Sequence, residues 1–168
     1  MLNIRPYEQS AGGYCGPACL KMVFGYFGVR KSERAFTALT GATSKDGVGA
    51  AGLLRAARAL GFTGFVKDSA TFADMRNYVL RKKIPVIVDW FSEDEGHYSV
   101  IMDINERRIV FADPEFGRRR TMPLAVFKRV WFDYVPNVPK KKSDFVIRRM
   151  VAVFPAFRGG TRAVRLPR

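Results

Sequence analysis

The hydrophobic period of the chain changes near residue 84, and this change constrains the fold more than any other feature of the sequence. Before it, apolar residues recur at helical spacing. After it come short runs rich in β-branched and aromatic residues, separated by turn residues. A helical half followed by a β half is typical of an α+β domain. We therefore expect an N-terminal helical layer packed on a C-terminal antiparallel β-sheet.

Glycine, proline and capping residues divide the first half into helices. Gly16 and Pro17 suit the start of a helix, and Ser32 and Thr71 suit the caps of two others. The predicted helices cover residues 16–28, 33–40, 50–61 and 71–83, and a predicted strand covers residues 61–68. In the second half the predicted strands are 84–91, 97–104, 107–113 and 144–154, with a short helix over 123–132. The last strand is expected at a sheet edge.

The length of 168 residues suits one domain, and the 48% of hydrophobic residues is enough for a folded core. No apolar run approaches the length of a membrane span, and the opening MLNIRPYEQS lacks the apolar core of a signal peptide. We therefore expect a cytoplasmic protein without a transmembrane segment. The two cysteines lie four residues apart within one helix, which is poor geometry for a disulfide, so both thiols are expected to be free.

Positive charge is concentrated at the C-terminus. The formal net charge is +14, and the residues from Pro139 onward hold nine Lys or Arg and one acid, which gives +8. We therefore divide the chain into a domain over residues 1–138 and a basic extension over residues 139–168, a late strand followed by a flexible tail. A basic run of this kind is typical of a solvated end, and also of a contact with nucleic acid, an acidic partner or a membrane surface.

Cys15 and His97 are the candidate nucleophile and base. Cys15 lies at a helix N-terminus after a glycine-rich loop, where the helix dipole favours a thiolate. His97 is the one histidine of the chain and opens the predicted strand HYSVIMDI. A cysteine nucleophile takes its base from a distant part of the sequence. The two residues come from opposite halves of the chain and can meet where the helical layer contacts the sheet.

Asp113 and Gln9 complete the candidate site. Asp113 ends the strand that follows the one opened by His97, and an antiparallel hairpin places these two ends side by side. Its carboxylate can hold the imidazole in one tautomer. Asp103 is a weaker alternative, because it lies in mid-strand. Gln9, six residues before Cys15, can supply a side-chain amide to an oxyanion beside the N–H of Cys15.

These residues resemble the peptidase C39 family of papain-like cysteine peptidases, which cut double-glycine leader peptides. The resemblance rests on QSAGGYCGPACLKM, GHYSVIMDI and ADPEFGRRRTMPLAVFKRVWF, extends to DGVGAAGLLRAARALGF and IPVIVDWF, and covers roughly residues 5–135. The six-residue interval from Gln9 to Cys15 and the sixteen-residue interval from His97 to Asp113 agree with the family.

The resemblance implies a papain-like fold, with Cys15 as nucleophile, His97 as general base, Asp113 as its orienting partner and Gln9 as oxyanion donor. It implies a peptide or protein substrate, of which a Gly-Gly leader peptide is the family's example, and no cofactor or metal. Members of this type are often fused to an ABC exporter. We expect a standalone peptidase, a partner of a separate exporter, or a relative with a different substrate.

Other interpretations stay open at this point. Cys15, Cys19 and His97 form a conceivable metal site that lacks a fourth convincing ligand, and Cys19 is more simply a packing residue. The same acyl-enzyme chemistry suits an amidase, a deamidase or a transpeptidase. A structural or binding domain whose basic tail contacts a polyanion is a further alternative. Near the C-terminus the sequence FPAFRGG also resembles the end of a leader peptide, which makes Gly160–Thr161 a possible self-processing site.

Overall fold

The computed structural model describes residues 1–93, 95–135 and 138–156. Within these residues one antiparallel sheet has six strands in the order β1-β8-β2-β3-β4-β5. The strands of this sheet are β1 (Phe62–Lys67), β2 (Val86–Ser92), β3 (Glu95–Ile104), β4 (Arg108–Asp113), β5 (Arg118–Pro123) and β8 (Arg149–Pro155). Two further strands, β6 (Phe132–Tyr134) and β7 (Phe145–Ile147), form a separate two-stranded ribbon.

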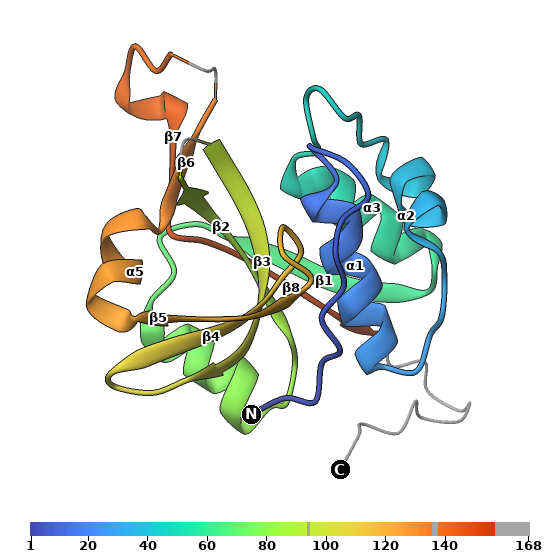
Figure 1. The fold of residues 1–168 in the computed structure, drawn as a ribbon, viewed down its shortest axis with the longest axis horizontal. Coiled ribbons are helices and arrows are strands. Elements are labelled where there is room, and N and C mark those ends of the chain that lie inside the picture. Colours follow the sequence, from blue (N-terminus) through green and yellow to red (C-terminus); the bar gives the residue numbers. More distant parts are fainter. Residues whose placement is uncertain (94, 136–137, 157–168) are drawn as a thin grey trace.

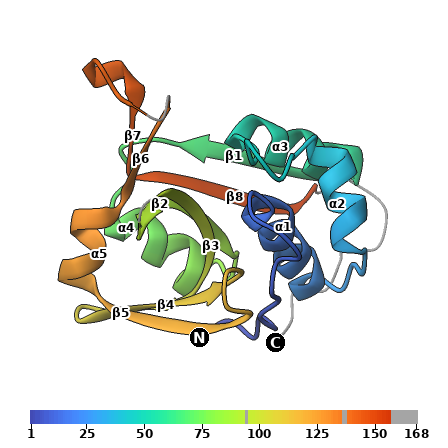
Figure 2. The same cartoon turned by 45° about the horizontal axis from the view of Figure 1, so that its top comes forward.

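The first three helices lie together on one side of the sheet, and α5 and the ribbon lie on the other side (Figure 1). The helices are α1 (Cys15–Tyr26), α2 (Glu33–Thr40), α3 (Ala50–Ala59), α4 (Phe72–Arg76), its continuation η1 (Asn77–Arg81), α5 (Leu124–Val130) and the short η2 (Lys142–Asp144). The sheet curves strongly, with β1 and β8 along one side and β4 and β5 along the other (Figure 2). None of the helices in the described part of the chain has the length and apolar character that a bilayer crossing requires.

Local capping determines where the helices begin and end. The Ser32 hydroxyl accepts the N–H of Ala35 at the start of α2, and Gly41 ends that helix in the left-handed conformation with φ of 73°. Thr71 and Asp74 form a capping box at the start of α4. The predicted helices and the first strand are therefore confirmed, and the second half is an antiparallel sheet as expected.

Aromatic packing attaches the helical layer to the sheet. The ring of Phe24 on α1 lies 5.1 Å from Phe36 on α2 and 4.1 Å from Phe62 at the start of β1, measured between ring centres. All three side chains are buried. Because α1 is held by this cluster and also contacts β3, the residue that begins α1 has a defined position relative to the sheet.

The prediction that the late strand lies at a sheet edge is wrong. β8 pairs with both β1 and β2, so it is an interior strand. Four consecutive side chains from Met150 to Val153 are fully buried, which is the pattern of a strand covered on both faces. The boundary at Pro139 stays a prediction. The single strand predicted over residues 144–154 is wrong, because the chain divides at Arg148, whose φ is +50°, into β7 of the ribbon and β8 of the six-stranded sheet. Gly160–Thr161 lies outside the described residues.

Two glycine substitutions test this packing. A side chain at Gly64 of β1 would overlap the carbonyl oxygen of Ala152 on β8, whereas nothing lies within 4 Å of the corresponding position at Gly25 of α1. We expect Gly64→Ala to lower the free energy of unfolding by about 1–3 kcal/mol, because a backbone carbonyl in an interior strand pair cannot move aside. Gly25→Ala is the matched control and should be neutral or stabilising by up to about 1 kcal/mol. Urea denaturation measures both, and equal effects would contradict the interior position of β8.

Candidate active site

Four neighbouring strands each place one side chain on the same face of the sheet. Trp90 on β2 lies directly opposite His97 on β3. The register of β3 and β4 puts Asp113 on this face, one diagonal step from His97. Arg120 on β5 pairs with Phe111, two residues before Asp113 and therefore on the same face. The face thus carries an indole, an imidazole, a carboxylate and a guanidinium in one row.

His97 and Asp113 form a buried hydrogen-bonded pair. The Nε2 of His97 lies 2.8 Å from Oδ1 of Asp113, and the two side chains are 6% and 0% exposed. The backbone N–H of Glu115 donates to the same Asp113 oxygen at 3.1 Å. The predicted contact between the two strand ends is confirmed. Asp103, the weaker alternative, instead lies 4.0 Å from the N-terminal amine.

The pair carries opposite charges at neutral pH. Burial of the ring lowers the pKa of His97, but the hydrogen bonds to Asp113 and Cys15 and the charges of these two groups raise that pKa from 6.5 to about 10. Burial raises the pKa of Asp113, but the hydrogen bond and charge of His97, with the Glu115 N–H and the charge of Arg120, outweigh burial and leave the pKa of Asp113 below its ordinary value. Both shifts favour an imidazolium beside a carboxylate.

Trp90 and Arg120 enclose this pair, and the sequence analysis singled out neither. The Trp90 ring lies 5.9 Å from the His97 ring, edge to face, and its Nε1 donates to Ser99 Oγ at 3.1 Å. The Arg120 guanidinium lies 5.1 Å from the Trp90 ring centre, and its Nη1 is 3.4 Å from Asp113 Oδ2. The sequence did contain a signal for Trp90, because the hairpin of the two neighbouring strands places an aromatic residue opposite His97. Arg120 lies on a strand that was not predicted.

Cys15 is the first residue of α1 and is half-buried. The loop before it depends on Gly13, whose φ is +72° and whose Cα faces the carbonyl oxygen of Thr43, so a side chain has no room there. Cys15 raises the pKa of His97, and because Nε2 of His97 is hydrogen-bonded to Asp113, Nδ1 is the ring nitrogen left for Cys15. The first N–H groups of a helix have no partner within it, so the N–H of Cys15 can donate to a ligand.

Cys19 lies one turn into α1 and is fully buried. Its Sγ is 3.3 Å from the carbonyl oxygen of Tyr98. Burial raises the pKa of the Cys19 thiol, and the charges of Cys15 and Asp113 raise it further. These contacts agree with a packing role for Cys19.

A different group has metal-ligand atoms close together, namely His97, Asp113 and Glu115. Their ligand atoms all lie within 4.8 Å of one another. Two of the three are already engaged, because Nε2 of His97 is hydrogen-bonded to Asp113. A metal ion at this position would have to replace that hydrogen bond.

Gln9 is attached to the end of the strand that bears Asp113. Its backbone N–H donates to the carbonyl oxygen of Pro114 at 2.8 Å. Its Nε2 donates to the carbonyl oxygen of Ala11 at 2.9 Å, and an amide nitrogen carries a second hydrogen. Oε1 of Gln9 is buried and has no hydrogen-bond partner among the described residues. The described residues therefore leave this amide oxygen without the hydrogen bond that a buried polar atom normally makes.

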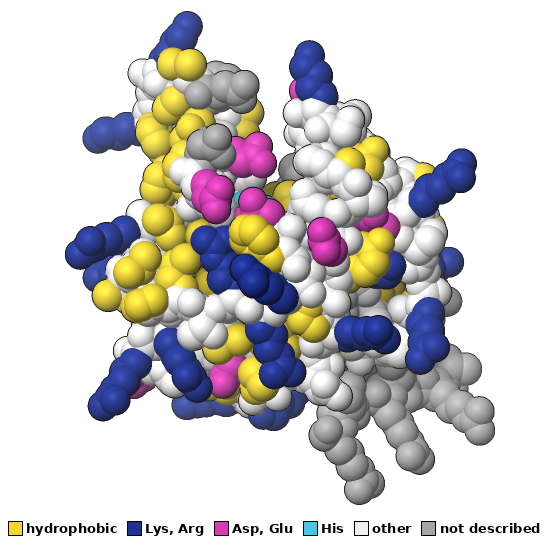
Figure 3. Space-filling view, in the orientation of Figure 1, with side chains coloured by type: hydrophobic (Ala, Val, Ile, Leu, Met, Phe, Trp, Pro, Cys, Tyr) yellow, Lys and Arg dark blue, Asp and Glu magenta, His cyan; other side chains and the backbone are white. Residues whose placement is uncertain are grey.

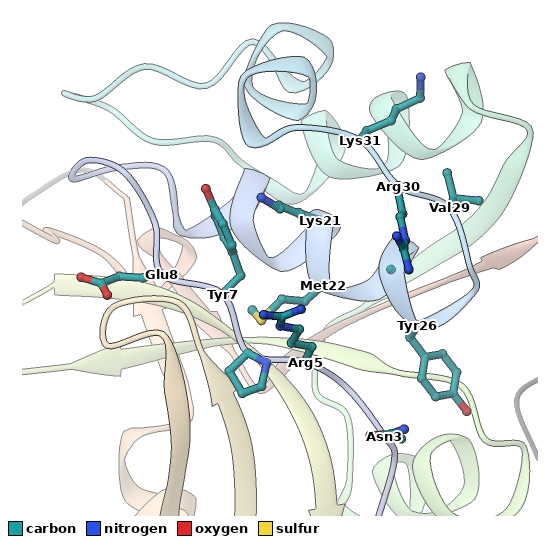
Figure 4. Close-up of a pocket in the computed structure, with 12 residues that line it drawn as sticks. Asn3, Arg5, Tyr7, Glu8, Lys21, Met22, Tyr26, Val29, Arg30 and Lys31 are labelled. Carbon is teal, nitrogen blue, oxygen red and sulfur yellow. The ribbon is translucent and has the colours of Figure 1, made fainter.

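A groove of about 800 Å³ runs along α1, and its lining includes Glu8 but neither Gln9 nor Cys15 (Figure 4). The N-terminal segment at residues 3–8 forms one wall, and α1 and residues 29–31 form the other. The amine of Lys21 lies 3.3 Å from the centre of the Tyr7 ring, and Met22 contributes apolar surface. Figure 4 shows basic side chains from both walls around the groove, which would suit an acidic or amphipathic chain.

A cysteine at a helix N-terminus, facing a histidine and a carboxylate on an antiparallel sheet, defines the papain-like class of folds. The chain belongs to the peptidase C39 family, whose model matches residues 4–143.

Relatives with and without an assigned role match this chain. An uncharacterized protein of Methanothermobacter marburgensis is 36% identical over 113 residues, which are 67% of this chain and 73% of that protein. The transport/processing ATP-binding protein ComA of Streptococcus pneumoniae is 32% identical over 120 residues, which are 70% of this chain but 16% of that protein.

Solved structures share the fold. The peptidase domain of Streptococcus ComA, a bi-functional ABC transporter, has a TM-score of 0.72 at 19% identity and covers 92% of this chain and 100% of that domain. A double glycine motif protease in complex with its leader peptide has a TM-score of 0.69 at 18% identity, covering 92% and 94% of the two chains. At these identities the likeness concerns the fold.

The pKa of His97 makes the stability of the fold depend on pH. Folding raises this pKa to about 10, so the charged histidine stabilises the folded state fully below its ordinary pKa of 6.5, and this stabilisation is lost as the pH rises through about 10. We expect His97→Gln to lower the free energy of unfolding more at pH near 6 than at pH near 10. Urea denaturation of both proteins across this range measures the difference, and a pH-independent difference would contradict the assignment.

The two cysteines should differ in alkylation. In the folded protein iodoacetamide should modify Cys15, which is half-buried beside an imidazolium, and spare Cys19, which is fully buried. Cys15→Ala should abolish this labelling, and unfolding the wild type should expose both thiols. Peptide mass spectrometry locates the modified residue. Equal labelling of the two cysteines in the folded protein would be incompatible with this site.

Proposed function

We propose that the protein is a cysteine peptidase that acts through Cys15, His97, Asp113 and Gln9. The observation that carries the proposal is the position of His97. Its Nε2 is hydrogen-bonded to a buried carboxylate, and its pKa is raised by that carboxylate and by Cys15. An imidazolium next to a cysteine at a helix N-terminus is the environment that favours a thiolate nucleophile.

In the first half of the reaction the Cys15 thiolate attacks the carbonyl carbon of the scissile peptide bond. The Cys15 N–H and the Gln9 amide donate to the oxyanion that forms. His97 gives its Nδ1 proton to the leaving amine as the carbon–nitrogen bond breaks, and a thioester remains on Cys15. Asp113 keeps its hydrogen bond to Nε2 throughout and holds the ring in orientation.

In the second half a water molecule attacks the thioester. Neutral His97 takes one proton from this water, and the oxygen adds to the carbonyl carbon. The carbon–sulfur bond then breaks, which releases a carboxylic acid and restores the thiolate beside the imidazolium. No cofactor is needed for either step.

The proposed substrate is a peptide cut after small residues, as at the Gly-Gly end of a leader peptide. Family membership and the leader-bound double glycine motif protease of similar fold support this choice. The groove along α1 supports it as well, because one wall comes from the helix that begins at Cys15 and the other from the segment that leads to Gln9. A separate ABC exporter is the proposed partner, by analogy with ComA. The cytoplasm is the proposed compartment, because the reaction requires a free thiol.

Cleavage of a synthetic peptide tests the proposal. The peptide carries an amphipathic upstream segment, Gly-Gly and a short following sequence, and mass spectrometry locates the cut. We expect the wild type to cut after Gly-Gly and Cys15→Ala to show no cleavage. Gln9→Ala should lower kcat about 10²–10³-fold with a smaller change in KM, because the oxyanion is present only during the reaction. Cys19→Ala is the matched control and should keep its activity.

The same assay separates the alternatives. If the acyl acceptor is an amine, as in a transpeptidase, adding an amine should yield a ligated product in place of the acid. If the protein is a binding domain, the folded wild type should bind peptide without turnover. Folded wild type that neither cuts Gly-Gly peptides nor transfers them to an amine would contradict the peptidase.

A further inference from the structure

The β6–β7 ribbon projects from the body of the protein (Figures 1 and 2). This projection carries unusually exposed apolar side chains. Val135 is 70% exposed, Val138 is 68% exposed, and Phe145 and Ile147 are 40% and 44% exposed. We call this surface, together with Lys140–Lys142 between the two strands, the β6–β7 arm.

Basic side chains accompany this apolar surface. Lys140, Lys141 and Lys142 are all exposed, and Arg148 follows β7 directly. Within the described residues none of these four makes an ion pair with a carboxylate. Figure 3 shows apolar side chains along the arm with Lys and Arg at its outer end. The acid next to the lysines, Asp144, accepts the backbone N–H groups of Lys140 and Lys141 and so shapes the turn.

The two strands of the arm pack on the main sheet and on each other. The ring of Phe132 stacks on Phe91 of the main sheet with ring centres 5.4 Å apart, and Tyr134 packs on the same ring. Phe145 of β7 packs against both Phe132 and Tyr134 of β6. A hollow of about 450 Å³ between the ribbon and α5, flanked by Lys128 and Arg148, continues the apolar surface.

We propose that the β6–β7 arm docks the protein on an anionic lipid membrane surface. Val135, Val138 and Ile147 would enter the boundary between headgroups and acyl chains, while the lysines would contact the lipid phosphates. Clusters of Lys and Arg beside exposed apolar residues attract anionic leaflets because each basic side chain adds to the attraction. The net charge of +14 acts in the same direction over longer distances.

The chemistry of the arm favours a bilayer over nucleic acid. Its most exposed apolar residues are aliphatic, and aliphatic side chains cannot stack on bases as the aromatic platforms of single-strand binders do. Hydrocarbon, by contrast, accepts valine and isoleucine directly. An acidic protein is the remaining alternative, and it is distinguished by the experiment below.

Docking through the arm would place the active site beside the membrane. The Asp133 carboxylate of β6 lies against Gly96, the residue before His97, with no space for a side chain between them. The base of the arm is therefore adjacent to the strand that bears the imidazole. This proposal does not depend on the peptidase activity, because it concerns a surface outside the Cys15 site.

Vesicle co-sedimentation of the full chain tests the proposal. We expect binding to vesicles that contain phosphatidylglycerol and none to pure phosphatidylcholine. The triple variant Lys140→Gln, Lys141→Gln, Lys142→Gln should bind about a hundredfold more weakly. The matched control Arg34→Gln, Lys45→Gln, Arg58→Gln removes the same charge from exposed residues on the helical side and should bind much closer to the wild type.

The apolar contribution is tested by Val135→Ser with Val138→Ser, whose exposed positions leave the folded core intact. This variant should lose vesicle binding while keeping the thermal midpoint of the wild type. Equal binding by both triple variants would show a general charge effect and overturn the proposal. Unchanged binding by the valine variant would mean a polyanion contact without insertion, and no binding to anionic vesicles would leave an acidic protein as the partner. Either result also overturns it.

Discussion

The buried hydrogen bond between His97 and Asp113 is the interaction on which the rest of the site depends. A charged imidazole inside a protein is stable only when an opposite charge and hydrogen bonds replace its water. The sheet supplies these through Asp113, which Glu115 N–H and Arg120 in turn support. Burial lowers the pKa of His97, and the hydrogen bond and charge of Asp113 oppose this effect and favour the charge that Cys15 faces.

The groove along α1 and the proposed docking arm lie on different parts of the fold. The groove along α1 is formed by the N-terminal segment, the first helix and residues 29–31. The β6–β7 arm projects elsewhere and contacts the strands of the site through Asp133 against Gly96 and through Phe132 and Tyr134 on Phe91. A peptide could therefore occupy the groove while the arm is engaged elsewhere, since neither surface covers the other.

Local patterns predicted most of the secondary structure. Ser32, Thr71 and Gly41 mark helix ends through hydrogen bonds and φ values within a few residues, so they are readable without a fold. The contact between His97 and Asp113 was also predictable, because the two strands are consecutive and antiparallel. In a short hairpin, residues that are close in the sequence are also close in space, so such a contact can be predicted without the whole fold.

The sequence by itself determined the α+β class, the helix ends, and the identity of Cys15, His97, Asp113 and Gln9 as the candidate site. Only the tertiary structure decided that β8 inserts between β1 and β2, because a run of apolar residues predicts a buried strand but does not indicate which strands pair with it. The same holds for Arg120, which reaches Asp113 from a strand too polar to be recognised. Pairing between distant strands is selected by burial over the whole molecule, and no local pattern carries that information.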